Sequence, residues 1–219
     1  MTTLLIATRN AHKVGEIRAI LGDRFQFLTL NNFPDAPKVI EDAYTFAGNA
    51  TKKALELARW LAADNSKLKT ENLKLDFVLA DDSGLAVVAL DGAPGVHSAR
   101  FAALDKFENS PDSDNNAKLL RLLQGVPLEQ RTARFHCVIA LAEIHPPSAI
   151  HHPQIFAGAC EGRIQFVAGG QGGFGYDPLF VPAGHTQSFA ELSEDVKNRL
   201  SHRGQALAEL KAYFSRLLT

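Results

Sequence analysis

The sequence predicts an α/β fold, because strand-like segments alternate with segments of helical periodicity along its first half. The second half is dominated by two long strand-like runs, and the chain ends in a helical pattern. With 219 residues, 46% of them hydrophobic, the chain is long enough for one substantial core. We therefore expect a single domain with two lobes over residues 1–219.

In the first half, short apolar runs predict the strands, and apolar residues at helical spacing predict the helices. The predicted strands are Thr3–Ile6, Phe25–Leu30, Leu75–Ala80 and Gly84–Leu90. The predicted helices are one with Val14, Ile17, Ile20 and Leu21 on one face, a long one over Phe46–Ala63 capped by Thr45, and a short one over Asp112–Leu123 closed by Gly125. The charged stretch Asp64–Lys74 is interpreted as a solvated loop.

The second half predicts two neighbouring strands and a broken helix. The strands are Thr132–Ile144 and Gln154–Ile164, and the helical pattern Glu191–Leu218 is interrupted near Ser201–Gly204. The loop His145–Pro153 between the strands contains His145, His151 and His152. Because prolines surround these histidines and no acid lies among them, a surface loop is favoured over a metal site.

Composition excludes several classes of protein. The net charge of -1 and the pI of about 6.7 provide no basic field for nucleic acid, so no nucleic-acid partner is expected. No apolar run is long enough for a bilayer, and the N-terminus lacks the pattern of a signal peptide, so no membrane partner is expected. Cys137 and Cys160 lie in strand-like runs without metal-ligand spacing, which is typical of core thiols in a reducing cytoplasm.

The most informative segment is Val78–Leu85, where an apolar run stops at Asp81 and Asp82 and a Ser-Gly turn follows. Acids at the end of a buried strand are costly unless a metal, a base or a hydrogen-bond donor compensates them. Two acids in one site also push their protonation equilibria apart. An Asp-rich turn that caps a strand is the structural alternative.

A companion signal lies at the start of the chain. Thr8 and Asn10 suit the N-cap region of the helix that follows, where free backbone N–H groups favour an anion. Lys13 falls in the first turn, where a cation opposes the helix dipole. A lysine reaching a bound phosphate explains it better, although simple capping is the alternative.

Two further groups carry chemistry. Asn49 and Lys53 are four residues apart and share a helix face, which is either a binding stripe or a solvated surface; for the adjacent Lys52 we favour the surface. The segment Gly170–Gly175 matches GxGxxG, but Pro178 and an extended run follow it where a dinucleotide site needs a helix. A glycine-rich ligand loop is favoured instead, with Phe174 or Tyr176 as a stacking face and Asp177 as a polar anchor.

These motifs resemble, in order along nearly the whole chain, the signatures of the inosine triphosphate pyrophosphatase family, also called non-canonical purine NTP pyrophosphatases. The matching residues are Thr8-Arg9-Asn10, Lys13 and Glu16; Thr45-Phe46, Asn49-Ala50 and Lys53-Ala54; Ala80–Leu85; Gly92–Val96 and Ser98–Arg100; Gly173–Pro178; and Lys197 with Ser201–Arg203. The bacterial housekeeping members are the most similar. Arg9 stands where the family frequently has glycine, a change within the phosphate loop.

The resemblance implies an elongated mixed β-sheet flanked by helices, with two lobes, a central nucleotide-binding cleft and a homodimer. It implies magnesium-dependent hydrolysis of ITP, dITP and XTP to the monophosphate and pyrophosphate. Asp82 would be the proton acceptor and a metal ligand, and Glu41 the second metal ligand. The residues implied to contact the nucleotide are Thr8, Arg9, Asn10, Ala11, His12, Lys13, Ser83, Phe174, Gly175, Tyr176, Asp177, Lys197, His202 and Arg203.

The residue chemistry agrees with this resemblance. Magnesium prefers carboxylate oxygens and bridges phosphates, and a nearby carboxylate can deprotonate an attacking water. Lys13 and Lys53 would neutralise the triphosphate. Two alternatives stay open: a pyrophosphatase for other modified nucleotides, including pyrimidines, and a nucleotide-binding module without catalysis. A pure binder has no need of Glu41 and Asp82 together with Lys13, which argues against the module.

Overall fold

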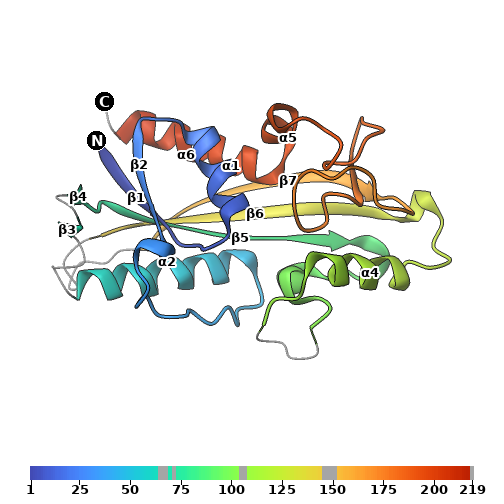
Figure 1. The fold of residues 1–219 in the computed structure, drawn as a ribbon, viewed down its shortest axis with the longest axis horizontal. Helices are drawn as coiled ribbons and strands as arrows, with labels where there is room; N and C mark the ends of the chain where they lie inside the picture. The colour runs from blue at the N-terminus through green and yellow to red at the C-terminus, as the bar shows by residue number, and fades with distance from the viewer. Residues whose placement is uncertain (64–68, 71–72, 104–107, 145–151, 218–219) are drawn as a thin grey trace. The chain divides into compact units, whose positions relative to one another are not determined.

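The computed structural model describes residues 1–219 except 64–68, 71–72, 104–107, 145–151 and 218–219. It contains a six-stranded sheet in the order β2-β1-β5-β6-β7-β8 (Figure 1). The strands are β1 (Thr2–Ile6), β2 (Phe25–Thr29), β5 (Phe77–Val87), β6 (Thr132–Glu143), β7 (Gln154–Ile164) and β8 (Phe180–Pro182). The helices are α1 (Ala11–Leu21), α2 (Phe46–Ala62), α4 (Asp112–Leu122), α5 (Glu194–Leu200) and α6 (His202–Leu217). The predicted α/β class is confirmed.

The chain divides into two compact units. Unit 1 comprises residues 1–82, 138–157 and 206–219, and unit 2 comprises residues 83–137 and 158–205. Strands β5, β6 and β7 each contribute residues to both units, and β5 changes unit between Asp82 and Ser83.

Unit 1 is built on parallel pairing of β1 with β2 and with β5. Parallel neighbours need crossover connections, and these supply α1 and α2. Helix α2 covers one face of the sheet, and α1 lies with α6 on the other (Figure 1). The face under α2 is filled by a cluster that includes Leu5, Leu57, Leu61 and Val78, all at most 1% exposed.

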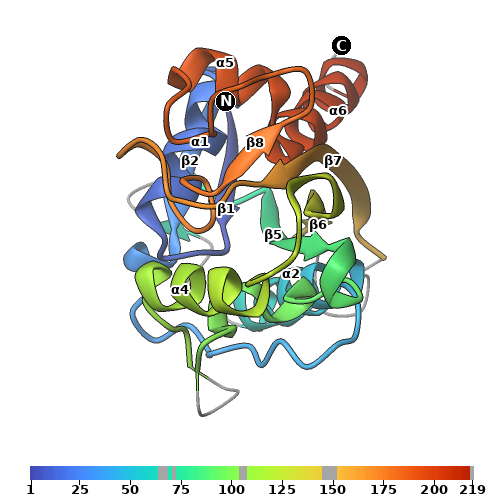
Figure 2. The same cartoon turned by 90° about the vertical axis from the view of Figure 1, so that its right-hand side faces the viewer.

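Unit 2 has its own core. Phe135 on β6 packs edge-on against Phe180 on β8 at 4.6 Å, and Phe180 contacts Phe189 at 5.1 Å between ring centroids. Leu119 anchors α4 to the same cluster. Figure 2 shows α4 on one side of the strands of unit 2 and α5 on the other.

The predicted break at the two aspartates is wrong. Strand β5 continues without interruption from Phe77 through Asp81 and Asp82 to Val87, and only residues 88–90 leave it, as a 3₁₀ turn. In the sheet β5 lies between β1, which pairs with it at Phe77–Leu79, and β6, and this sheet context overrides the local turn preference of Asp, Ser and Gly. The acids therefore lie within a central strand.

Smaller corrections concern the ends of elements and the connections between them. Strand β2 stops at Thr29, because the predicted Leu30 begins a 3₁₀ turn. Within the stretch predicted as a loop, β3 (Lys69–Thr70) pairs with β4 (Leu73–Lys74), while 64–68 and 71–72 lie outside the described residues. His145 and His151 also lie outside them, and His152 is exposed.

Several other predictions are confirmed. Strand β7 has the predicted bounds, the terminal helix is interrupted at Ser201, and Thr45 caps α2 by accepting a hydrogen bond from Gly48 N at 3.0 Å. Cys137 and Cys160 are buried free thiols. Among the helices that the structure describes, none has the length and apolar character needed to cross a membrane.

Leu57→Ala should lower the free energy of unfolding by about 2–5 kcal/mol, because it opens a cavity between α2 and the sheet. Arg59→Ala, an exposed change on the same helix, should cost no more than about 0.5 kcal/mol. Urea unfolding of both variants measures the difference. Equal losses in the two variants would contradict the packing that we describe.

Candidate active site

The turn between β1 and α1 presents backbone groups and one lysine. Asn10 is the N-cap of α1, and its side chain accepts a hydrogen bond from Lys13 N at 3.1 Å. Thr8 Oγ1 accepts from Asn10 N at 3.1 Å and so shapes the turn. Arg9, Ala11 and His12 are exposed. The predicted capping is therefore confirmed, and this turn offers an exposed helix N-terminus.

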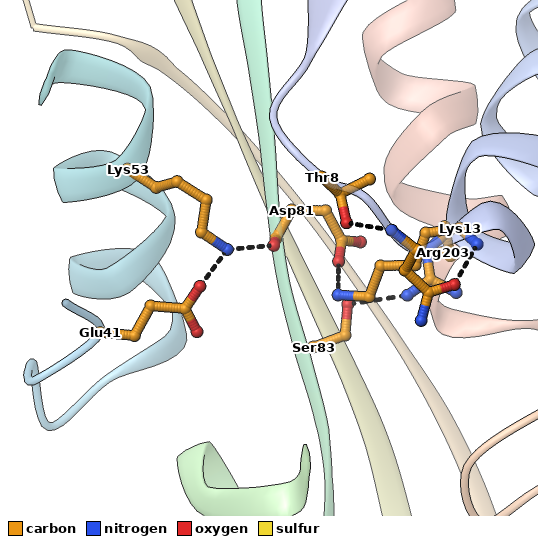
Figure 3. A network of polar contacts seen from close by, with 8 residues as sticks. Thr8, Lys13, Glu41, Lys53, Asp81, Ser83 and Arg203 are labelled. Carbon is orange, nitrogen blue, oxygen red and sulfur yellow. Dashed lines mark hydrogen bonds and ion pairs between the residues drawn. The ribbon is translucent and has the colours of Figure 1, made fainter. Parts of the chain in front are cut away.

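Lys13 forms an ion pair with the buried carboxylate of Asp81 on β5 (Figure 3). The Asp81 side chain is only 2% exposed, so the lysine compensates a charge that would otherwise be costly to bury. Lys13 itself is 19% exposed and could exchange this partner for a ligand anion.

On the other side of β5, Lys53 of α2 joins the strand to the segment that precedes α2. Its ammonium pairs with Glu41 and donates a hydrogen bond to the backbone oxygen of Asp81 at 3.1 Å (Figure 3). One turn earlier on α2, the fully buried Asn49 accepts a hydrogen bond from Ala43 N at 2.9 Å. The predicted face shared by Asn49 and Lys53 is thus turned toward the sheet.

Asp82 is buried, and its Oδ2 has no hydrogen-bond partner among the described residues. Burial raises the pKa of its carboxyl to about 6, and the charge of Glu41 adds to this shift. Lys53, Lys13 and the Asn49 amide oppose the shift only in part.

The expectation that Asp81 perturbs Asp82 is wrong. Successive side chains of a strand point to opposite faces, so the two carboxylates lie in separate environments. Asp81 is neutralised by Lys13, and the acid that raises the pKa of Asp82 is Glu41.

The glycine-rich loop of unit 2 does not lead into a helix. It therefore lacks the helix that a dinucleotide-binding GxGxxG motif needs, as predicted. Gly173 and Gly175 both have positive φ, +71° and +63°, where side chains are strained. A Cβ on Gly173 would also lie 2.2 Å from Asp177 Oδ2. Glycine at these positions lets the chain turn tightly around the Asp177 carboxylate.

Asp177 organises this loop. It is 3% exposed, and its Oδ2 accepts hydrogen bonds from Phe174 N at 2.8 Å and from Lys197 Nζ at 2.7 Å. Lys197 Nζ also lies 5.1 Å from the centroid of the Phe174 ring, and Arg203 Cζ lies 5.5 Å from it. A half-buried aromatic ring is therefore placed beside two donor-only cations.

The start of α6 places the last predicted residues. Arg203 is 2% exposed and donates a hydrogen bond to Ser83 Oγ at 3.1 Å (Figure 3). His202 stacks on Phe135 with centroids 4.7 Å apart. Tyr176 is buried and donates its hydroxyl to Ser98 O at 2.8 Å, so Phe174 is the better stacking face.

The predicted residues thus fall into two groups, one in each unit. The group in unit 1, which we call the carboxylate–lysine cluster, comprises the turn Thr8–Lys13 with Glu41, Asn49, Lys53, Asp81 and Asp82. The group in unit 2, which we call the aromatic loop cluster, comprises Ser83, Phe174, Gly175, Tyr176, Asp177, Lys197, His202 and Arg203.

Sequence reasoning missed the residues that support the aromatic loop. Asp112 Oδ2 accepts from Gly175 N at 2.6 Å, and Asn116 Nδ2 donates to Gly175 O at 2.9 Å. Ser98 accepts the Tyr176 hydroxyl. The spacing of four between Asp112 and Asn116 was visible, but several polar residues crowd the start of α4 and all suit a helix terminus.

Carboxylate oxygens are the groups here that suit a metal ion. Among the described residues, no three His, Cys, Asp or Glu side chains form a ready metal cluster. Magnesium commonly uses one or two carboxylates and completes its shell with water and phosphate. The unpartnered Asp82 oxygen and the partly exposed Glu41 fit that requirement.

Comparisons with known proteins agree on one family. The model of the Ham1 family matches residues 4–213. A dITP/XTP pyrophosphatase of Desulforamulus reducens is 47% identical over 215 residues, which cover 98% of this chain and 96% of the relative. A HAM1 protein of Coxiella burnetii has a solved structure with a TM-score of 0.78 and 35% identity, covering 99% of this chain and 100% of that one. The solved structure of a nucleoside-triphosphatase, or dITP/XTP pyrophosphatase, from Mycobacterium abscessus has a TM-score of 0.67 and 36% identity, covering 95% of this chain and 98% of that one.

The raised pKa of Asp82 makes its contribution to stability depend on pH. The folded value of about 6 exceeds the ~3.9 of an unfolded chain, so the folded protein holds an extra proton between these pH values. Its free energy of unfolding should therefore fall as pH rises from about 4 to 6. Because an asparagine side chain does not titrate, the free energy of unfolding of Asp82→Asn should rise by about 1–3 kcal/mol relative to that of the parent between pH 4 and pH 8.

Urea unfolding in EDTA at each pH measures this gain, with Asp35→Asn as an exposed control. A difference between Asp82→Asn and the parent that does not change with pH would contradict the assignment.

Proposed function

This chain belongs to the Ham1 family, and we propose that it hydrolyses non-canonical purine nucleoside triphosphates, dITP, ITP and XTP, to the monophosphate and pyrophosphate. The observation that carries the proposal is the carboxylate–lysine cluster, where a buried carboxyl with a pKa of about 6 lies among groups suited to phosphate. The name of the Desulforamulus reducens relative supports the choice of substrate.

The phosphate end of the substrate suits the turn Thr8–Lys13. The exposed N-terminus of α1 offers backbone N–H groups and a positive dipole end. Lys13 and Lys53 add two cations, each held by a carboxylate in the free protein. Phosphate oxygens would compete with Asp81 and Glu41 for these ammonium groups, so binding exchanges one set of ion pairs for another.

Asp82 is suited to accept the proton of the attacking water. A general base is most effective when its pKa lies near the working pH, because it must be ionised yet still basic. Burial and Glu41 bring Asp82 into that range, and its free Oδ2 is available to a water molecule. The loss of the water proton to Asp82 accompanies formation of the new P–O bond and departure of the pyrophosphate.

Magnesium is proposed as the cofactor, held by Glu41 and Asp82. A bound magnesium ion would neutralise phosphate charge as a Lewis acid. Lys53, which pairs with Glu41 in the free protein, would turn from this carboxylate to the phosphates, and Asn49 would keep its hydrogen bond to Ala43 N.

The base is proposed to bind at the aromatic loop cluster. Phe174 supplies a stacking face, which accepts any purine. Lys197 and Arg203 carry only donors, so they suit the 6-oxo acceptor of hypoxanthine and xanthine and oppose the 6-amino donor of adenine. A buried donor that faces a donor is costly, and this cost supports selection of deaminated purines.

We also propose that units 1 and 2 act together as one catalytic domain, and that the protein is a homodimer in the cytoplasm, as the resemblance implies. Light scattering after size exclusion tests the homodimer directly.

The decisive measurement is pyrophosphate release from dITP, XTP and dATP, with and without magnesium. We expect magnesium-dependent release from dITP and XTP at rates far above that from dATP. Asp82→Asn should lower kcat by about 10²–10⁴-fold, because an amide cannot accept the proton. Nucleotide binding without pyrophosphate release would favour a non-catalytic module, and a preference for other nucleotides would favour a different pyrophosphatase.

Adjacent lysines allow a matched test of the phosphate contacts. Lys53→Ala should raise KM for dITP and XTP alike by about tenfold or more, because a charged partner of the phosphates is lost. Lys52→Ala removes a surface lysine that pairs with Asp42 at 2.7 Å and should leave KM unchanged. Equal KM values for the two variants would show that Lys53 has a structural role and does not contact the phosphates.

A further inference from the structure

The first residues of α4 hold both backbone polar groups of one residue in the aromatic loop, Gly175. Asp112 Oδ2 accepts a hydrogen bond from Gly175 N at 2.6 Å, and Asn116 Nδ2 donates one to Gly175 O at 2.9 Å. The two side chains are one helical turn apart, so they lie on the same face of α4. Together they satisfy the donor and the acceptor of a single residue.

This arrangement is not ordinary helix capping. Pro111 is the N-cap of α4, and no side chain caps the helix end. Asp112 instead reaches a residue 63 positions away, and Asn116 reaches the same residue 59 positions away. The bonds therefore serve the loop rather than the helix.

Helix α4 is itself firmly held within unit 2. Asn115 is 2% exposed and accepts a hydrogen bond from Ala102 N at 2.8 Å, while Leu119 is fully buried in the core cluster. A side chain on such a helix has little freedom to follow a moving loop. Because α4 is fixed, Asp112 and Asn116 hold the backbone of Gly175 in one position.

Gly175 lies between the two aromatic residues of the loop. Its φ of +63° sets the direction of the chain between Phe174 and Tyr176. Tyr176 is tied to Ser98, and Phe174 N is tied to Asp177. Phe174 O also accepts a hydrogen bond from Asp177 N at 3.2 Å. A free Gly175 would nevertheless loosen the chain between Phe174 and Tyr176, because glycine permits many backbone conformations.

We propose that Asp112 and Asn116 are positioning residues that hold the backbone of Gly175 and so fix the Phe174 ring for stacking on the purine base. This inference rests on the proposed function. Neither side chain touches the phosphates in this scheme, so both act on the affinity for the base and leave the chemical step unchanged.

The test compares two inhibitors of dITP hydrolysis, deoxyinosine monophosphate and inorganic tripolyphosphate. Asp112→Ala and Asn116→Leu should each raise KM for dITP and the inhibition constant of deoxyinosine monophosphate by about tenfold, the effect of one lost hydrogen bond. The inhibition constant of tripolyphosphate should be unchanged, because its partners lie in the carboxylate–lysine cluster. The kcat should stay within about threefold of the parent value.

Two variants complete the design. Asp112→Asn keeps an acceptor oxygen and should behave like the parent. Asp114→Ala removes a neighbouring acid of α4 that accepts a hydrogen bond from Ser113 Oγ at 3.2 Å, and it should leave KM and both inhibition constants unchanged. Thermal unfolding of each variant shows whether it is folded, and amide exchange at Gly175 should quicken in Asp112→Ala even where the fold is intact.

The outcomes separate the two proposals. If the parent neither hydrolyses dITP nor binds deoxyinosine monophosphate, the proposed function fails. The positioning role is overturned if the parent is active but Asp112→Ala binds the monophosphate normally. It is also overturned if the affinity of Asp112→Ala for tripolyphosphate falls as much as its affinity for the monophosphate. An Asp112→Asn variant as weak as Asp112→Ala would show that charge acts here rather than the hydrogen bond, and would also overturn it.

Discussion

The structure depends on carrying two consecutive carboxylates through a central strand. Because β5 does not break, Asp81 and Asp82 project to opposite faces and meet different partners. Asp81 receives Lys13, and its charge is compensated. Asp82 receives no cation of its own and shares its surroundings with Glu41, so its proton is held more tightly. One strand thus gives two identical side chains different states, one carboxylate in an ion pair and one carboxyl with a raised pKa.

The proposed chemistry is divided between the units in the same way. Residues suited to phosphate belong to unit 1, and those suited to a purine belong to unit 2, while Asp82 and Ser83 are neighbours in the chain. The unit 1 groups are charged and exchangeable, whereas those of unit 2 are fixed by hydrogen bonds around Asp177. Under the proposed function, recognition of the base would depend on rigidity, and capture of the phosphates would depend on the exchange of partners.

Local signals predicted much of this arrangement. The cap at Thr45, the bounds of β7 and the turn Thr8–Lys13 follow from short-range preferences, and the structure agrees. The continuity of β5 could not be predicted, because its place inside the sheet, beside β6, outweighs the turn preference of Asp-Asp-Ser-Gly. The link from Asp112 to Gly175 was equally hidden, because it joins residues 63 positions apart and nothing local distinguishes that aspartate from a helix-terminal one.

The lysine–carboxylate pairs also affect how strongly the free protein attracts an anion at long range. Lys13 and Lys53 are each matched by a carboxylate, and Asp82 contributes further negative charge when ionised. The charges of these five side chains therefore nearly cancel in the free protein, and in solution charges are screened beyond about 8–10 Å. These two lysines therefore add little to the long-range attraction of a polyanion. The encounter with a triphosphate is then governed by short-range fit, and its rate should depend little on ionic strength.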